Sequence, residues 1–172
     1  MIQNKISDIV KNSPIEEDPK HSILTRKWLL KICPDASEDM QIAALAHDIE
    51  RAVPPRIRGI PGENYDQTKQ RHAKRSADIA AKIMEEIGFI KEDIAKVKHL
   101  IENHEVGGDK ESDYLRDADS IAYFEYNVNL YFKRNGAEKT KDKIMFMFGR
   151  CSERAKKMIQ QIDFKPEIRK LF

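Results

Sequence analysis

Apolar residues recur along most of the chain at the three- and four-residue spacing of amphipathic helices. A first short helix is predicted over residues 1–12 by the apolar side chains of Ile2, Ile6, Ile9 and Val10. Further helices are expected at residues 18–33, from about 38 to the Pro54-Pro55 pair, and at 66–87, 91–104, 113–135 and 137–161. The pattern predicts an all-α fold: a single-domain helical bundle over residues 1–172, with a core at about 18–135 and C-terminal helices at 137–172 packed on it.

Some of these boundaries carry specific signals. Asp18 is a good N-cap and Pro19 suits the first position of a helix. Gly88 stands where the 66–87 helix would need a left-handed residue to end. Residues 52–65, rich in proline and glycine, form the only long irregular segment that we expect, and loops of this length are often functional.

Composition narrows the class of protein. Hydrophobic residues make up 40% of the 172 residues and charged residues 35%, as in a soluble globular domain. The net charge of +2 does not indicate a nucleic-acid partner. Cys33 and Cys151 form no disulfide framework and suggest a reducing compartment. No apolar run reaches membrane length and the N-terminus has no signal-like apolar region, so we expect a cytoplasmic protein without a membrane partner.

The dipeptide His47-Asp48 ends an apolar helical run and is the first candidate for chemistry. An imidazole and a carboxylate are costly to bury unless they find a partner, and a divalent cation suits both.

Three other histidines fall where they could reach the same ion. His21 lies in the first turn of a helix with an apolar face, His72 on the predicted inner stripe of the 66–87 helix, and His104 at the end of a buried stripe. His99 lies about 160° around its helix from that stripe, at ~100° per residue, so we assign it to the surface.

The predicted 113–135 helix adds two aspartates, Asp117 and Asp119, and periodicity alone does not choose between them. Imidazole and carboxylate ligands together suit Fe, Mn, Co, Ni or Zn in a hydrolytic site, so one or two such ions are the expected cofactor. The candidate set contains no thiolate, which argues against a structural zinc site.

Basic side chains near these residues are candidates for binding phosphate, because arginine forks match phosphate oxygens and positive charge attracts them. The candidates are Arg51, Arg56, Arg58, Arg71 and Lys74.

The order His…His-Asp…His…His…Asp resembles the HD superfamily of metal-dependent phosphohydrolases. The matching segments are Lys20-His21-Ser22, Leu45-Ala46-His47-Asp48, Arg71-His72-Ala73-Lys74-Arg75-Ser76-Ala77, Ile101-Glu102-Asn103-His104 and Arg116-Asp117-Ala118-Asp119-Ser120-Ile121. Six positions in order are a stronger signal than a lone His-Asp pair. The pattern matches best the subset of that superfamily with two extra histidines between the His-Asp pair and the last aspartate. That subset is similar to HD-type dinucleoside polyphosphate hydrolases and cyclic-dinucleotide phosphodiesterases, which bind two metals. The stretch also resembles an uncharacterised bacterial family of HD-like proteins.

This resemblance implies a fold of the HD type and a ligand set. The first metal would be held by His21, His47, Asp48 and Asp119, the last chosen because it falls in the Ala-Asp of the final motif. His72 and His104 would hold a second metal, with Asp48 bridging. A hydroxide between the ions would attack phosphorus. With Asp48, the resemblance makes Glu50 and Arg51 candidates for a role in catalysis. Arg51 stands where some HD families place a substrate-binding side chain, whereas Glu50 is out of step with families that use an acid three residues after the aspartate.

The expected activity is phosphomonoesterase or phosphodiesterase action on a nucleotide or similar small phosphate ester. No Gly-Tyr-Pro motif follows, so a cyclic dinucleotide is not favoured, and the segment after His104 differs from that of the polyphosphate hydrolases. Two alternatives use the same residues: a di-iron HD-type oxygenase, and a non-catalytic regulatory HD domain that binds a nucleotide.

Overall fold

The helices expected from the sequence form an all-α bundle in a computed structural model, which describes residues 1–55, 60 and 62–172. The α-helices are α1 (Ile2–Val10), α2 (Asp18–Ile32), α3 (Glu38–Ala46), α4 (Tyr65–Ile87), α5 (Lys91–Asn103), α6 (Lys110–Ala122), α7 (Val128–Gly149), α8 (Glu153–Gln160) and α9 (Pro166–Arg169). A 3₁₀ turn, η1 (Ile49–Ala52), follows α3, and a π-helical turn, η2 (Tyr123–Asn127), joins α6 to α7. Within the described ranges no helix is long and apolar enough to cross a membrane.

Helix α3 lies at the centre of the bundle. It contacts α1, α2, α4, α5 and α6, and α4 packs against α5 while α2 packs against α6. The α3 residues Ile42, Ala43, Ala44 and Ala46 are 0% exposed. Short alanine side chains let neighbouring helices approach closely, so the small residues of α3 bring several helices to the end that carries His47.

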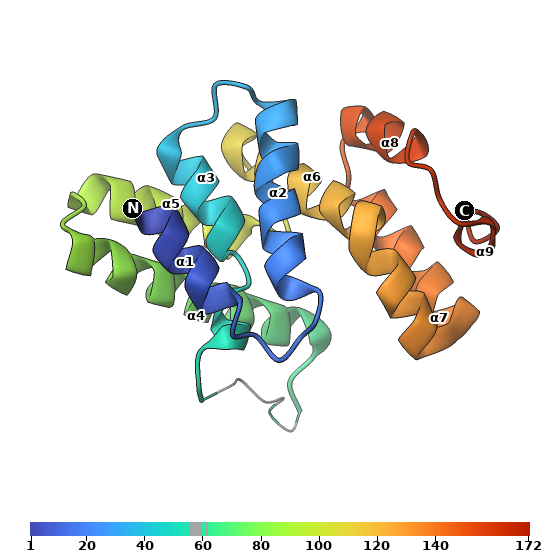
Figure 1. The fold of residues 1–172 in the computed structure, drawn as a ribbon, viewed down its shortest axis with the longest axis horizontal. Helices are drawn as coiled ribbons and strands as arrows, with labels where there is room; N and C mark the ends of the chain where they lie inside the picture. The colour runs from blue at the N-terminus through green and yellow to red at the C-terminus, as the bar shows by residue number, and fades with distance from the viewer. Residues whose placement is uncertain (56–59, 61) are drawn as a thin grey trace.

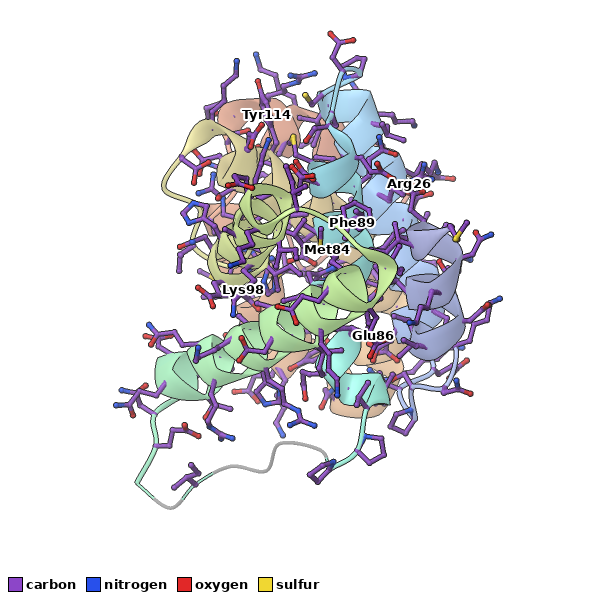
Figure 2. All side chains as sticks on the ribbon, turned by 90° about the vertical axis from the view of Figure 1, so that its left-hand side faces the viewer. Arg26, Met84, Glu86, Phe89, Lys98 and Tyr114 are labelled. Atoms are coloured by element: carbon purple, nitrogen blue, oxygen red, sulfur yellow. The ribbon has the colours of Figure 1, made fainter. Side chains whose placement is uncertain are left out.

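Charged contacts tie the outer helices to this body. Lys5 of α1 pairs with Glu86 of α4 at 2.8 Å, and Lys98 of α5 pairs with Asp78 of α4 at 2.5 Å. Figure 2 shows this face, with Glu86 on α4 near α1 and Met84 among the helices. The Met84 side chain is fully buried. Exposed pairs of this kind contribute little to stability, so the apolar contacts beneath them hold the helices together.

The C-terminal helices α7, α8 and α9 lie on the opposite side of α2 and α6 from α4 and α5 (Figure 1). The predicted stop at Gly136 is visible as a break within α7, where Gly136 has φ 77° and ψ −179°. The π-helical turn η2 was not expected and divides the predicted 113–135 helix. Ser152 accepts a hydrogen bond from Ala155 N and caps α8, which divides the predicted 137–161 helix.

The expected helix from residue 38 to the Pro54-Pro55 pair is wrong, because α3 ends at Ala46. The ring nitrogen Nδ1 of His47 lies 3.0 Å from the Ala44 carbonyl. That carbonyl is the acceptor that a further helical residue would use. His47 and Asp48 therefore lie in the bend between α3 and η1, where their side chains can turn toward other helices.

We predict that Gly88→Ala destabilises the fold by about 1 kcal/mol, because Gly88 has φ 94° and an alanine there is strained. Urea denaturation measures the loss. Gly149→Ala is the matched control: its φ is not left-handed and its added Cβ meets open space, so stability should be unchanged or slightly higher. Equal loss in both variants would contradict the role of the left-handed turn.

Candidate metal centre

Three side chains from two segments, α2 and the bend between α3 and η1, meet at the end of α3. Among the described residues, His21, His47 and Asp48 each offer one ligand atom, and these atoms all lie within 4.8 Å of one another. The His47 Nε2 atom lies 3.2 Å from His21 Nε2 and 3.5 Å from Asp48 Oδ2. Neighbouring ligands bonded to one ion at about 2.1 Å are themselves about 3 Å apart, so the spacing fits a metal.

Helix α6 adds a carboxylate to this cluster. The Asp119 Oδ1 atom lies 2.9 Å from His21 Nε2 and 3.7 Å from His47 Nε2. Asp117 instead accepts hydrogen bonds from the Ser152 amide, at 3.0 Å, and from its hydroxyl. Of the two aspartates that periodicity left open, the structure brings Asp119 to the histidines and turns Asp117 to the start of α8.

Two histidines are fixed in the orientation that a metal requires. The Nδ1 atom of His47 lies 3.0 Å from the Ala44 carbonyl, and Nδ1 of His104 lies 2.7 Å from the Ile101 carbonyl. A carbonyl only accepts, so each ring donates from Nδ1 and keeps the lone pair on Nε2. The two rings are 5.1 Å apart between centroids, which places His104 beside the cluster.

His72 lies beside the site but is more exposed than the predicted inner stripe implies. Its side chain is 28% exposed, at the edge of α4 rather than on the buried stripe, which is formed by Ala73, Ser76, Ala77, Ala80, Ala81, Ile83 and Met84. The ring still lines a hollow of about 120 Å³ together with Asp48 and His104. The prediction that His72 faces the core is therefore wrong, but five of the six candidate ligands lie around the cluster and the sixth lines the adjoining hollow.

Glu50 lies behind His72. It is 1% exposed, one of its oxygens accepts a hydrogen bond from His72 Nδ1, and it lines neither the hollow nor the larger cavity described next. This corrects its candidacy as a group that touches the reacting atoms. The hydrogen bond to Glu50 holds the His72 ring by Nδ1 and leaves the lone pair on its Nε2, so Glu50 can act only by positioning His72.

A cavity of about 730 Å³ opens beside the cluster, and His21, Asp48, His104 and Asp119 form part of its wall. Its described lining carries five carboxylates and five cations. These are Glu16, Glu17, Asp48, Glu105, Asp119, Arg51, Lys69, Arg134, Lys143 and Arg150. With neutral histidines this wall is balanced in charge, so a bound divalent cation would make it positive.

Arg51 keeps the central carboxylate ionised. Its Nη1 atom lies 2.7 Å from Asp48 Oδ2 and 3.1 Å from Asp18 Oδ1. Burial alone would raise the pKa of the Asp48 carboxyl, but Arg51, the largest of several opposing charges, helps to hold that pKa well below its usual range. A carboxylate held as an anion is ready to bind a metal without first losing a proton.

Arg150, at the end of α7, does the same for Asp119. Its guanidinium bonds Asp119 and Glu105, and its Nε donates to Ser120 Oγ at 2.9 Å. Burial raises the pKa of Asp119, but the charge of Arg150 and the hydrogen bond from His21 lower it well below its usual range. Burial likewise acts to raise the pKa of Glu105, but the charges of Lys69 and Arg150 lower it to about 2.

The histidines differ in their readiness to bind a metal. Burial lowers the pKa of His47 to about 4, so its ring is neutral and able to act as a ligand. Burial also acts to lower the pKa of His21, but the hydrogen bond to Asp119 and the charges of Asp119 and Asp48 together outweigh it and raise that pKa. Two imidazoles and two carboxylates that meet in this way fit a divalent transition metal.

Two of the predicted phosphate-binding residues, Arg71 and Lys74, lie away from this cavity. Arg71 bonds Glu63 at 2.9 and 2.6 Å, and Lys74 lies 3.8 Å from Asp78. Both line a separate hollow, because the alanine stripe of α4 faces inward and turns these side chains to the outer surface. Arg56 and Arg58 lie outside the described residues, and of the predicted set only Arg51 is shown to line the cavity.

Of the cations that line the cavity, Arg51 was predicted to bind phosphate, whereas Lys69, Arg134, Lys143 and Arg150 were not. Lys143 and Arg150 stand four residues before and three after Met147, on one face of α7, and this spacing was the available signal. Burial, reinforced by the charge of Lys69, lowers the pKa of Lys143 to about 8. Lys143 forms no salt bridge with any residue in the described ranges, so its charge is available to an anion in the cavity.

Comparison with known proteins gives one match. The model of a family described as a domain of unknown function (DUF4202) matches residues 4–172. Neither a curated protein nor a solved structure matches the chain.

We predict that Asp48→Ala loses bound metal, because it removes the carboxylate that lies between the cluster and the adjoining hollow. Elemental analysis of protein purified with Mn²⁺ or Fe²⁺ measures the content per chain. His99→Ala is the control, because His99 is exposed and pairs with Asp109 at 2.8 Å on the surface. Metal content in Asp48→Ala equal to that of the parent would rule out the site.

A second pair of variants separates the two aspartates of α6. Asp119→Asn should lower metal content, whereas Asp117→Asn should keep it and lose about 1–3 kcal/mol of stability, because the bonds to Ser152 weaken. Metal analysis and thermal unfolding of both proteins measure the two effects. The reverse pattern would assign the ligand to Asp117.

Proposed function

We propose that the chain, which belongs to the DUF4202 family, is an HD-type metal-dependent phosphohydrolase that acts on a nucleotide or similar phosphate ester. The observation that supports this is the meeting of His21, His47 and Asp48 beside a cavity whose wall carries five cations. Metal ligands and cations around one cavity suit a substrate that carries a phosphate.

The ligands divide into two groups in this proposal. His21, His47, Asp48 and Asp119 would hold a first ion, and Asp48, His72 and His104, which line the adjoining hollow, a second. A divalent metal bound there would supply a Lewis acid and a water of lowered pKa. Fe, Mn, Co, Ni and Zn all suit this donor set.

The chain's own residues would bind and orient the phosphate. Arg51 and Arg150 are occupied in holding Asp48 and Asp119 as anions. Lys143 has no such partner among the described residues and lines the same cavity, so it is the cation best placed to contact phosphate oxygens. Two positively charged neighbours, Lys69 and Arg150, add to the field that attracts an anion there.

The cavity also supports a small substrate. Its volume of about 730 Å³ lies in the range of small-molecule sites. The two free cysteines, Cys33 and Cys151, support a reducing and hence cytoplasmic setting as part of the proposal.

The proposal predicts that metal-loaded protein releases inorganic phosphate from at least one member of a panel of nucleotides and simple phosphate esters. A chelator should abolish release, Mn²⁺ should restore it, and Asp48→Ala should lower it by more than about a hundredfold. His99→Ala serves again as the control. A phosphate-release assay on the purified full chain measures all four.

Other outcomes would replace the proposal. Oxygen uptake with a mixed-valent di-iron signal, and no phosphate release, would identify an oxygenase. Tight nucleotide binding without turnover by metal-loaded protein would identify a regulatory domain.

A further inference from the structure

One face of the α6–α7 segment runs from the metal-binding cluster along the cavity. Asp119, Tyr123, Asn127 and Tyr131 follow one another at intervals of four, and all four line the cavity. In an α-helix, residues four apart drift about 40° around the axis at ~100° per residue. The wider π-helical turn η2 reduces this drift, so the four side chains stay on the cavity side.

Two buried polar atoms on this face have no partner within the described ranges. They are the hydroxyl of Tyr123 and Oδ1 of Asn127, and these residues are 6% and 9% exposed. Buried polar atoms in proteins are almost always hydrogen-bonded to protein, water or ligand. Because both residues line the cavity, its contents are the remaining source of a partner.

The chemistry of these atoms defines what they can bind. Asn127 Oδ1 only accepts, so it needs an N–H or O–H donor, while the Tyr123 hydroxyl can donate or accept. The rings of Tyr123 and Tyr131, 6.4 Å apart between centroids, add aromatic surface. A group with hydrogen-bond donors and a flat ring matches this face.

Charge divides the cavity into two ends. Lys143 lies 5.9 Å from the centroid of the Tyr123 ring, on the side of the metal-binding cluster. Further along, Arg134 bonds Glu17, with Nη1 2.9 Å from the glutamate oxygen, and the Glu16 carboxylate also lines the cavity and acts on Arg134, so this end carries no unpaired positive charge. The first end suits a phosphate and the second an uncharged group, which disfavours a ligand with phosphates at both ends.

Resting on the proposed function, we infer that Tyr123, Asn127 and Tyr131 form the subsite for the nucleoside part of a nucleoside monophosphate. At ~1.5 Å per residue, Asn127 lies about 12 Å along the helix from Asp119. A nucleoside whose phosphate lies beside Asp119 and Lys143 can bridge that length. The η2 turn is then a specificity device, because it keeps the recognition residues in line with the metal ligands.

Binding of nucleosides tests this independently of hydrolysis, since a nucleoside has no phosphate to release. Isothermal titration calorimetry of metal-loaded protein with the four common ribonucleosides and their 5′-monophosphates should detect binding. Asn127→Leu and Tyr123→Phe should each weaken it about tenfold, the effect of one hydrogen bond. Tyr126→Phe, on the same turn but outside the cavity lining, should leave it unchanged. Thermal unfolding checks that every variant is folded.

Each remaining outcome is decisive. If no nucleoside or nucleoside monophosphate binds, only water occupies this end and the inference is overturned. Equal binding of ribose 5-phosphate, with the same losses in both variants, would overturn it in favour of a sugar phosphate. Nucleoside binding without phosphate release would keep the subsite and refute the proposed hydrolase. Phosphate release from p-nitrophenyl phosphate without nucleoside binding would refute the subsite and keep the proposed hydrolase.

Discussion

The arrangement depends on burying two carboxylates as anions. Asp48 and Asp119 are each held by an arginine, Arg51 and Arg150, and burial without these cations would push the carboxyls toward the neutral form. Buried ion pairs rarely stabilise a fold more than apolar side chains of similar size would. Their presence beside two buried histidines is better explained by a need for fixed negative charge, which a metal site would have.

The same backbone contacts that end two helices also orient the candidate ligands. His47 and His104 are the C-terminal caps of α3 and α5, and in each the Nδ1 atom bonds the carbonyl three residues earlier. Each bond satisfies a carbonyl at a helix end and leaves Nε2 with its lone pair. Two helices that are unrelated in sequence therefore end in the same way, and both ends meet at one point.

Sequence reasoning succeeded where chemistry is local and failed where it depends on how helices meet. The all-α class and the helix-end position of His104 follow from periodicity, whereas the helix that carries His47 was expected to run on to the Pro54-Pro55 pair and instead ends at Ala46. The choice of Asp119 came from the order of the HD-like motif, not from its helical face. His72 was misplaced because the inward stripe of α4 is built largely of alanines, which a pattern based on isoleucines overlooks.

The missed residues share a physical cause. Arg150 and Lys143 reach the cavity only when α7 folds back over it, and their shared helical face does not indicate which part of the molecule that face meets. The η2 turn likewise could not be predicted from the sequence, since a π-helical turn needs no particular residue.

The position of α7 also changes how the domain should be divided. The sequence suggested a core at about 18–135 with later helices packed on it, but Arg150 bonds Asp119 and Glu105, and Lys143 and Met147 complete the cavity wall. Removing α7 would leave Asp119 buried without its cation and open one side of the cavity. Because the cation that holds Asp119 as an anion follows α7, and α7 completes the cavity wall, this helix belongs to the site as much as the motif that precedes it.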